Sequence, residues 1–421
     1  MYKRINTGQE LISIIRMGTN GVIVGEGWIG KLTACFIEKY AQKKLENVSI
    51  ENITRAKSIS NVLIIAQPEK MGKELAERLI DICEGNVFYL SNDIKDEMDR
   101  TMMADYPDVY EVEVLLARKK ELDKEMHLKF SHEIENMFAL PHFPIFQEIE
   151  IETLNRCNGT CSFCPINRAD DTRPFMKMKR ELFESIIQQL SEIGYRGRVG
   201  LYSNNEPLLD NRIVDFARYT WEKLPNACKI IYTNGILLKK AVFLQLLEYI
   251  DILCIDLYYD KQEDEVLTEN MVEVLRYGMA HTNVQEKVML QFINRNAIRN
   301  NRGGKSKNRK SVYQVTATCM LPYIQMIVRP DGKLSLCCND ALGENTLGDL
   351  NEDGLVKAWN RPQYHAVRER IMQGRQCVEF CKNCDNYASV NTKGNEEFSK
   401  EEMKSSWDRL KNRLIGAWER L

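Results

Sequence analysis

The sequence predicts an α/β protein built from parallel strands and crossover helices, and three observations support this fold class. Short apolar runs such as residues 62–66 alternate with stretches of helical periodicity over the first 310 residues, as βαβ units do. A glycine-rich turn follows the strand that ends at Val24. Residues 311–390 hold clustered cysteines and little hydrophobic periodicity, which favours a fold supported by metal in that segment.

The bulk composition excludes several classes of protein. The chain has 421 residues, with 58 Lys and Arg against 60 Asp and Glu and a net charge of −2. The overall charge therefore does not favour binding to nucleic acid or to an anionic membrane. No apolar run reaches the roughly 18–20 residues of a spanning helix, and a secretory signal is not expected. We therefore expect a cytoplasmic protein, in which thirteen cysteines favour metal or redox chemistry over disulfides.

The N-terminal region, residues 1–140, carries a candidate nucleotide-binding turn. Three glycines follow a predicted strand and open a predicted helix with the spacing G-x-G-x-x-G, the context in which this motif binds a dinucleotide on a Rossmann-like sheet. Glu51 ends the next predicted strand, where a ribose-binding carboxylate is expected. Bulky Trp28 and acidic Glu26 oppose a pyrophosphate contact, so a structural or partner-docking role stays open. The candidate cofactor-binding glycines are Gly25, Gly27 and Gly30.

The second region, residues 145–310, again alternates strands with helices, in repeats of a size suited to a barrel or partial barrel. A polar helix expected at 112–137 leads to it. A cysteine-rich third region follows at 311–390, and residues 391–421 are predicted to form an amphipathic helix that packs on the body of the protein. The strands predicted in the second region span 147–153, 198–202, 229–232, 252–256 and 288–292.

Three cysteines stand in a C-x3-C-x2-C loop directly after the first strand of the second region. Iron–sulfur clusters are normally held by four cysteines, so a loop with three leaves one iron of a 4Fe–4S cube open for a substrate or cofactor. A zinc knuckle is the alternative, although zinc sites usually show paired C-x2–4-C units and four ligands. The expected metal ligands are Cys157, Cys161 and Cys164.

This loop, with the aromatic Phe163 before its last cysteine, resembles the signature of the radical S-adenosylmethionine superfamily. There the open iron chelates S-adenosylmethionine, and one electron yields a 5′-deoxyadenosyl radical. Residues 202–207 resemble the superfamily's glycine-glycine-glutamate-proline segment, with polar residues in place of the glycines. Residues 232–235 and 301–304 resemble its Thr-Asn-Gly and Asn-Arg-Gly turns. The resemblance implies cofactor contacts from Phe163, Asn205, Glu206, Thr233 and Asn234.

The cysteines of the third region resemble the SPASM/twitch extension of the same superfamily. The chain lacks the C-x2-C-x5-C-x3-C run of two-cluster domains, and what remains fits the one-cluster version of the twitch-type aminocyclitol dehydrogenase. A structural zinc ribbon is the alternative. The implied ligands of this second 4Fe–4S cluster are Cys319, Cys337, Cys381 and Cys384, while Cys338 and Cys377 are spare.

The residues after Cys337 bear on the reaction. In sulfatase-maturing relatives an Asp directly after a cluster cysteine is thought to take a proton. Here Cys338 holds that position and Asp340 lies two residues further. Cys338 could instead donate a hydrogen atom, which would make the enzyme an epimerase, or be a small buried residue beside the cluster. Cys338 and Asp340 are therefore the candidate catalytic residues.

The predicted fold is an N-terminal Rossmann-like domain, a partial (β/α)6 radical-SAM barrel, and a C-terminal Cys-rich SPASM/twitch iron–sulfur domain with a helical tail. The predicted function is oxidation of a hydroxyl-bearing carbon on a sugar- or aminocyclitol-like molecule, using S-adenosylmethionine, two 4Fe–4S clusters and a reductant such as flavodoxin or ferredoxin. Peptide maturation by epimerisation or cross-linking is an alternative. Interpretations from other classes are an NAD-dependent dehydrogenase with structural clusters and a catalytically silent binding protein.

Overall fold

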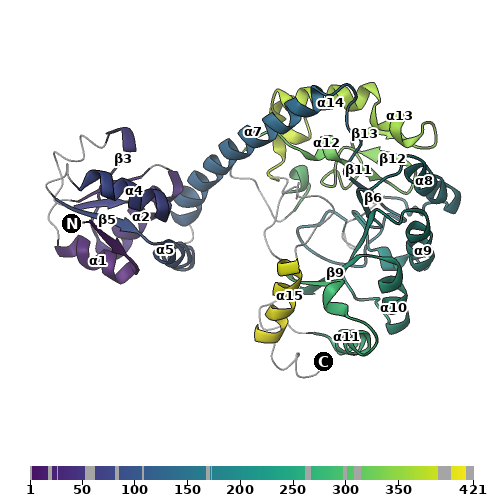
Figure 1. Ribbon diagram of the computed structural model, residues 1–421, viewed down its shortest axis with the longest axis horizontal. Coiled ribbons are helices and arrows are strands. Elements are labelled where there is room, and N and C mark those ends of the chain that lie inside the picture. The colour runs from purple at the N-terminus through teal and green to yellow at the C-terminus, as the bar shows by residue number, and fades with distance from the viewer. Residues whose placement is uncertain are drawn as a thin grey trace. The chain divides into compact units, whose positions relative to one another are not determined.

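The chain divides into two compact units, Met1–Glu125 and Met126–Leu421. The computed structural model describes residues 2–17, 21–25, 27–52, 62–80, 85–106, 109–166, 171, 173–260, 267–296, 301–307, 314–386 and 400–413. The division falls within the long helix α7 (Leu116–Phe138), drawn in Figure 1. Among these residues, no helix combines the length and apolar character needed to cross a membrane.

The first unit is a parallel five-stranded sheet with the order β1-β5-β4-β2-β3. Counted from β2, the order is 2-1-3-4, which is the flavodoxin-like doubly wound arrangement and differs from the 3-2-1-4 of a dinucleotide-binding sheet. The Rossmann-like prediction is therefore not confirmed. The elements are β1 (Tyr2–Ile5), α1 (Gly8–Met17), β2 (Gly21–Val24), α2 (Gly27–Ala41), β3 (Glu46–Val48), β4 (Val62–Ile65), α4 (Glu69–Leu79), β5 (Asn86–Leu90) and α5 (Asn92–Asp105).

The predicted strand that ends with Glu51 is found earlier in the sequence than expected. β3 ends at Val48, and Ile50–Asn52 form a 3-10 turn in which Glu51 is exposed. The polar helix expected at 112–137 is found: a π-helical turn (Tyr110–Leu115) runs directly into α7.

The second unit is an eight-stranded sheet with the order β10-β9-β8-β7-β6-β11-β12-β13. The six strands from β10 to β11 are parallel, and β12 and β13 add an antiparallel edge. The strands are β6 (Glu148–Ile151), β7 (Arg198–Gly200), β8 (Cys228–Thr233), β9 (Ile252–Tyr259), β10 (Val288–Asn294), β11 (Gln325–Val328), β12 (Lys333–Ser335) and β13 (Thr346–Asp349).

The five strands predicted between 145 and 310 are all found, but they do not make six β/α units. In the described part of this region, β6 to β10 are joined by four helices that lie along one side of the sheet in Figure 1. The sixth parallel strand is β11, which comes from the cysteine-rich region and pairs with β6. The four helices are α8 (Arg180–Glu192), α9 (Ile213–Lys223), α10 (Lys240–Tyr249) and α11 (Glu269–His281).

Strand β6 has the alternating sequence Glu-Ile-Glu-Ile, and this alternation gives the sheet two different faces. Ile149 and Ile151 belong to the apolar core that also contains residues of α8. Glu148 and Glu150 point to the opposite face, where Gln325 of β11 donates hydrogen bonds to both carboxylates at 3.1 and 3.2 Å. The inner face of the sheet is therefore polar although these side chains are buried.

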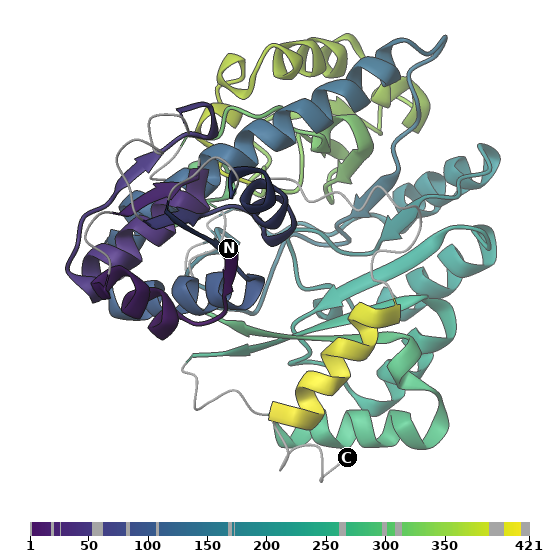
Figure 2. The same ribbon diagram turned by 60° about the vertical axis from the view of Figure 1, so that its left-hand side comes forward.

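The cysteine-rich region adds α12 (Leu321–Ile324), α13 (Leu355–Trp359) and α14 (Pro362–Met372) around β11–β13. The predicted tail helix is α15 (Lys400–Arg413), which lies beside β10 (Figure 2). The indole of Trp407 donates a 2.9 Å hydrogen bond to the Val288 carbonyl, so the helix packs on the body as expected. The rest of the predicted tail, including Leu414, Trp418 and Leu421, lies outside the described residues.

Candidate active site

The three-cysteine loop leaves the carboxyl end of β6 and closes tightly around its first sulfur. The amide of Gly159 donates to Cys157 Sγ at 3.3 Å, and a Cβ on Gly159 would lie 3.3 Å from the same sulfur. Burial raises the pKa of the Cys157 and Cys161 thiols to about 12. Such thiols become thiolates when a metal coordinates them, and the donor set of three soft sulfurs fits iron.

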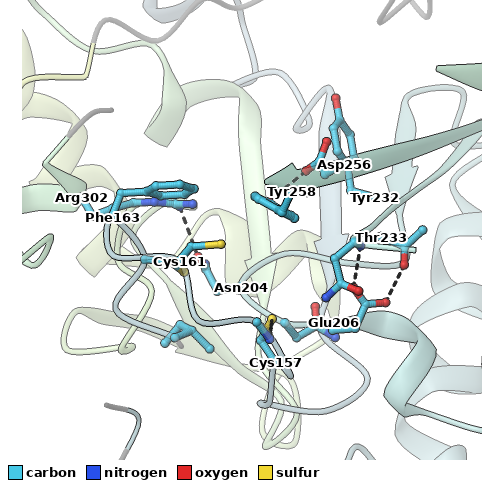
Figure 3. A pocket seen from close by; sticks show the side chains of 15 residues that line it. Cys157, Cys161, Phe163, Asn204, Glu206, Tyr232, Thr233, Asp256, Tyr258 and Arg302 are labelled. Atoms are coloured by element: carbon cyan, nitrogen blue, oxygen red, sulfur yellow. Dashed lines mark hydrogen bonds between the residues drawn. The ribbon is translucent and has the colours of Figure 1, made fainter. Parts of the chain in front are cut away.

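A cavity of about 160 Å³ opens beside this loop, at the carboxyl ends of the parallel strands (Figure 3). Ligands of open parallel sheets bind at this edge. The wall combines the cysteines with side chains from four strand ends. Its lining residues are Cys157, Gly159, Cys161, Phe163, Cys164, Ile166, Asn204, Asn205, Glu206, Tyr232, Thr233, Asn234, Asp256, Tyr258 and Arg302. All five residues expected to contact S-adenosylmethionine therefore lie at one cavity, together with the three cysteines.

Glu206 is the buried acidic group of this cavity, and its two oxygens are held by the end of β8 and by its own turn. It accepts hydrogen bonds from Thr233 Oγ1 at 2.6 Å, the Asn234 amide at 2.8 Å and the Leu208 amide at 3.0 Å. Burial raises the pKa of its carboxyl, and these three donors oppose that shift. The carboxylate is thereby fixed where it can accept from an ammonium group in the cavity.

The side-chain amide of Asn205, next to Glu206, also bears on whether the cavity fits a cofactor with amino and carboxylate groups. Its Oδ1 accepts a 3.0 Å hydrogen bond from the Ser203 amide. Its Nδ2 is buried and has no hydrogen-bond partner among the described residues. Buried donors are normally satisfied, so this amide is available for a carboxylate beside the ammonium site of Glu206. The pair fits the amino and carboxylate groups of a methionine moiety.

Arg302 and Asn204 connect this cavity to the second group of cysteines. Both donate to the carbonyl of Cys338, from Arg302 Nη1 at 3.2 Å and from Asn204 Nδ2 at 2.9 Å. Arg302 Nη1 also donates to Asn204 Oδ1 at 3.3 Å, a contact drawn in Figure 3. Arg302 has φ +50°, a left-handed conformation that is uncommon for a residue other than glycine.

The four cysteines predicted to hold the second cluster are brought together in the structure. Cys319, Cys337, Cys381 and Cys384 are all buried, and the charges of the other three affect the pKa of Cys337, which burial raises. No three His, Cys, Asp or Glu side chains of the described residues are close enough to share a single metal ion. Each ligand of a four-iron cube binds a different iron, so a cluster requires wider sulfur spacing than one zinc ion.

The turn at 301–304 packs directly on this cysteine group. The Asn301 amide donates to Asp385 Oδ1 at 2.7 Å, and Asn301 Oδ1 accepts from the Asp385 amide at 3.2 Å. Gly303 has φ +62°, and a Cβ there would lie 2.2 Å from the ring of Phe380. The Asn-Arg-Gly motif therefore joins the Cys381–Cys384 segment to Arg302 at the cavity.

The two residues predicted to be catalytic have different surroundings. Asp340 accepts hydrogen bonds from three amides of its own loop, those of Leu336, Glu344 and Asn345. These contacts give it a loop-ordering role and do not support the predicted catalytic one. Cys338 is partly buried, and its pKa is raised by desolvation and by the negative charge of Glu150, with Arg302 opposing. Its thiol therefore belongs to the polar inner face of the sheet.

Sequence analysis missed the acidic row along β6. Glu148 pairs with Arg198 at 2.7 Å, while Glu152 accepts a 2.8 Å hydrogen bond from the Asn204 amide. Burial raises the pKa of Glu152 to about 7. Glutamates at every second position of an otherwise apolar strand were the available signal, since they share one face.

The glycine motif of the first unit makes packing contacts. A Cβ on Gly25 would lie 2.3 Å from a carbonyl oxygen of the neighbouring chain segment, and one on Gly30 would lie 2.5 Å from the Gly25 carbonyl. Gly27 has φ +75°. At the start of α2, Glu121 accepts a 3.2 Å hydrogen bond from the Trp28 amide. A carboxylate thus caps the helix where the motif predicts a pyrophosphate, and nucleotide binding stays a prediction that these contacts do not support.

Comparisons with known proteins identify one iron–sulfur domain in this chain and several similar enzymes. The family model for SPASM, an iron–sulfur cluster-binding domain, matches residues 319–385. The S-adenosyl-L-methionine-dependent 2-deoxy-scyllo-inosamine dehydrogenase of Niallia circulans is 27% identical over 253 residues, which cover 59% of this chain and 96% of the relative. The crystal structure of BtrN in complex with AdoMet and 2-DOIA aligns with a TM-score of 0.50 and 25% identity, covering 61% of this chain and 98% of that chain.

The chain carries a SPASM domain, and its homologues are radical S-adenosylmethionine enzymes, as the cysteine motifs predicted. It is a homologue of a radical S-adenosylmethionine dehydrogenase, so the predicted oxidoreductase class is confirmed. S-adenosylmethionine and iron–sulfur clusters are the cofactors that this family implies.

Proposed function

We propose that the protein is a radical S-adenosylmethionine dehydrogenase that oxidises a hydroxyl-bearing carbon of an aminocyclitol- or sugar-like molecule to a carbonyl. The observation that carries the proposal is the shared Cys338 carbonyl. Arg302 and Asn204 of the cavity wall both donate to it, and Cys337 of the second cysteine group is the adjacent residue. A substrate on the inner face would therefore lie between the two groups of cysteines.

In this proposal Cys157, Cys161 and Cys164 hold one 4Fe–4S cluster, and Cys319, Cys337, Cys381 and Cys384 hold the other. When bound, S-adenosylmethionine and the first cluster would supply the radical chemistry that removes one hydrogen atom from the substrate carbon, and a second cluster would supply an acceptor for the following electron. The accompanying proton passes to the carboxylates of the inner face. A small reductant of the flavodoxin or ferredoxin class supplies electrons to the first cluster.

The chain's own residues contribute binding and electrostatics. Glu206 and Asn205 orient the amino-acid end of S-adenosylmethionine, since one accepts from its ammonium and the other donates to its carboxylate. Three buried glutamates, Glu148, Glu150 and Glu152, form an acidic row on the inner surface of the sheet. Such a surface suits a substrate with several hydroxyl groups and an amino group, and the homologue from Niallia circulans is named for the amine 2-deoxy-scyllo-inosamine.

The proposal is tested with 2-deoxy-scyllo-inosamine carrying deuterium at the carbon to be oxidised. The protein is reconstituted without oxygen and reduced in the presence of S-adenosylmethionine. We expect deuterium in 5′-deoxyadenosine and a product that has lost two hydrogen atoms. Deuterium transfer with a product of unchanged oxidation state, in which hydrogen replaces the deuterium, would contradict dehydrogenation while leaving radical chemistry intact.

One observation favours a second candidate function, epimerisation. The Cys338 thiol is partly buried on the inner face near Glu150 and Arg302, where it could return a hydrogen atom to a substrate radical. This function predicts solvent deuterium in a product of unchanged oxidation state. It also predicts that Cys338→Ala abolishes that product, whereas a dehydrogenase retains its activity in this variant.

A further inference from the structure

Arg375 is a fully buried cation next to the second cysteine group. Its Nε donates to the Ala317 carbonyl at 2.6 Å, and its Nη1 donates to the Asn386 carbonyl at 2.7 Å and the Cys384 carbonyl at 3.5 Å. The third nitrogen, Nη2, is buried and makes no hydrogen bond to any described residue. Only 1% of the residue's surface is exposed.

The position of this guanidinium relates it to three of the four cysteines. Its carbonyl partners are Cys384 itself, Asn386, and Ala317, which lies two residues before Cys319. The 3-10 turn that contains Arg375 (Arg375–Cys377) packs on the 3-10 turn that contains Cys381 (Cys381–Asn383). A buried cation at this position stabilises negative charge on the nearby sulfurs.

The other charged groups near these cysteines are arranged differently. Asp340 lies three residues after Cys337, and three backbone amides already compensate its carboxylate. Lys382 pairs with Glu379 at the surface. The hydrogen bonds that Arg375 donates within the described part of the chain all go to carbonyl oxygens, and a buried charge without a counter-charge is costly. Asp385, between the two residues whose carbonyls Arg375 Nη1 contacts, is a buried carboxylate that accepts from the Asn301 amide. An anionic iron–sulfur cluster would be a second counter-charge, and its sulfurs would accept from Nη2.

We propose that Arg375 is a positioning residue that raises the reduction potential of the auxiliary cluster, with Nη2 donating to one of the cluster's sulfurs. The inference rests on the proposed function, in which this cluster takes one electron from the substrate radical and later passes it to an external carrier of the flavodoxin or ferredoxin class. Reduction adds one negative charge to a buried site. A nearby cation and an N–H···S bond stabilise that charge, and both are known determinants of cluster potential.

The test uses a parent protein in which Cys157, Cys161 and Cys164 are replaced by Ala, so that only the auxiliary cluster remains. Its potential is measured by redox titration followed by electron paramagnetic resonance, with iron content determined for each sample. Arg375→Gln should lower the midpoint by about 59 mV or more, which is tenfold in the ratio of reduced to oxidised cluster for one electron. Arg375→Lys, which keeps the charge, should recover at least half of that shift.

Arg368→Met is the matched control, because Arg368 is equally buried but lies among aromatic rings, 4.0 Å from the Trp359 centroid. Its removal should leave the potential nearly unchanged. Equal shifts in the Arg368 and Arg375 variants, or no shift in Arg375→Gln at full iron content, would overturn this inference but would leave the proposed function standing. A parent that binds no iron would overturn both the inference and the auxiliary cluster of the proposed function.

A second measurement detects the contact directly in the parent protein, with Arg375 in place. Protein carrying ¹⁵N-labelled arginine and the reduced auxiliary cluster is examined by pulsed electron paramagnetic resonance. We expect a nitrogen coupling from the guanidinium that disappears in Arg375→Lys. Absence of any such coupling in the parent protein would place Arg375 away from the cluster and would overturn the inference.

Discussion

Arg302 binds the carbonyl of Cys338 at 3.2 Å across two motifs that are 36 residues apart in the sequence. The same nitrogen contacts Asn204 Oδ1, and Asn204 donates to the same carbonyl. The cavity wall and the loop that bears Cys337 are therefore held together by one peptide group. The contact links the cavity in which we expect S-adenosylmethionine to bind with the cysteines that we expect to hold the electron-accepting cluster.

Removing Arg302 should uncouple substrate oxidation from S-adenosylmethionine cleavage. A hydrogen bond from a charged group contributes about 1.5–3 kcal/mol, so in Arg302→Gln we expect roughly a tenfold or larger fall in product formed per 5′-deoxyadenosine. Both compounds are quantified by mass spectrometry in the same reaction. Arg361→Gln, which loses an ion pair to Glu352, is the control. An unchanged ratio in Arg302→Gln would show that the contact is dispensable for coupling.

Glu206→Gln should weaken binding of S-adenosylmethionine. The amide would present hydrogens to a site where Thr233, Asn234 and Leu208 already donate, and the charge that attracts an ammonium group would be lost. We expect Kd to rise about tenfold or more, as measured by equilibrium dialysis, with iron content unaffected. Glu184→Gln, on α8 and paired with Arg180 at 3.4 Å, is the control. Equal affinities would remove Glu206 from the cofactor site.

Gly303→Ala and Gly304→Ala form a matched pair at the auxiliary site. Both residues have positive φ, but a Cβ on Gly303 would lie 2.2 Å from the Phe380 ring, whereas one on Gly304 would lie 3.5 Å from its nearest neighbour, Asn383. Strain alone costs about 1–3 kcal/mol, and only Gly303→Ala adds a clash. We expect Gly303→Ala to lose about half of its iron after reconstitution while Gly304→Ala keeps most of it. The opposite order would contradict the packing described here.

Glu152 should make the stability of the protein depend on pH. Burial raises its pKa to about 7, so the folded chain binds this proton more tightly than the unfolded chain does. The resulting stability is complete below about pH 4.3, the unperturbed value, and is lost as pH rises through 7. In Glu152→Gln the free energy of unfolding in urea should therefore fall less between pH 5 and 8. The difference is about 1.4 kcal/mol for each pH unit that separates the folded from the unfolded pKa. Parallel curves for the variant and the wild type would be inconsistent with a raised pKa.

The cysteine loops and the order of strands along the chain could be predicted from the sequence because both are local signals. Spacing within Cys157–Cys164 determines how many sulfurs one loop presents, and an apolar run marks each strand. Pairings between distant segments leave no such signal. The parallel register of Gln325 with Glu148 and the contact of Arg302 with Cys338 depend on how the whole sheet is assembled.

The glycine motif shows why a pattern alone was insufficient. Gly25 and Gly30 satisfy the spacing of a phosphate-binding turn, yet the same lack of a side chain also serves close backbone packing. Whether the helix N-terminus is vacant depends on Glu121, which lies 93 residues from Trp28 in the sequence and leaves no local signal. The order of strands within the sheet, which distinguishes a dinucleotide-binding sheet from other doubly wound sheets, is likewise absent from the motif.

The most direct test of radical chemistry is the formation of 5′-deoxyadenosine. The protein, reconstituted with iron and sulfide without oxygen, is reduced with dithionite in the presence of S-adenosylmethionine and 2-deoxy-scyllo-inosamine. We predict 5′-deoxyadenosine in the wild type, none in Cys157→Ala, and unchanged formation in a variant of the exposed Cys377. Full iron loading without any 5′-deoxyadenosine, or equal amounts in wild type and Cys157→Ala, would contradict the assignment of this loop as the site of S-adenosylmethionine cleavage.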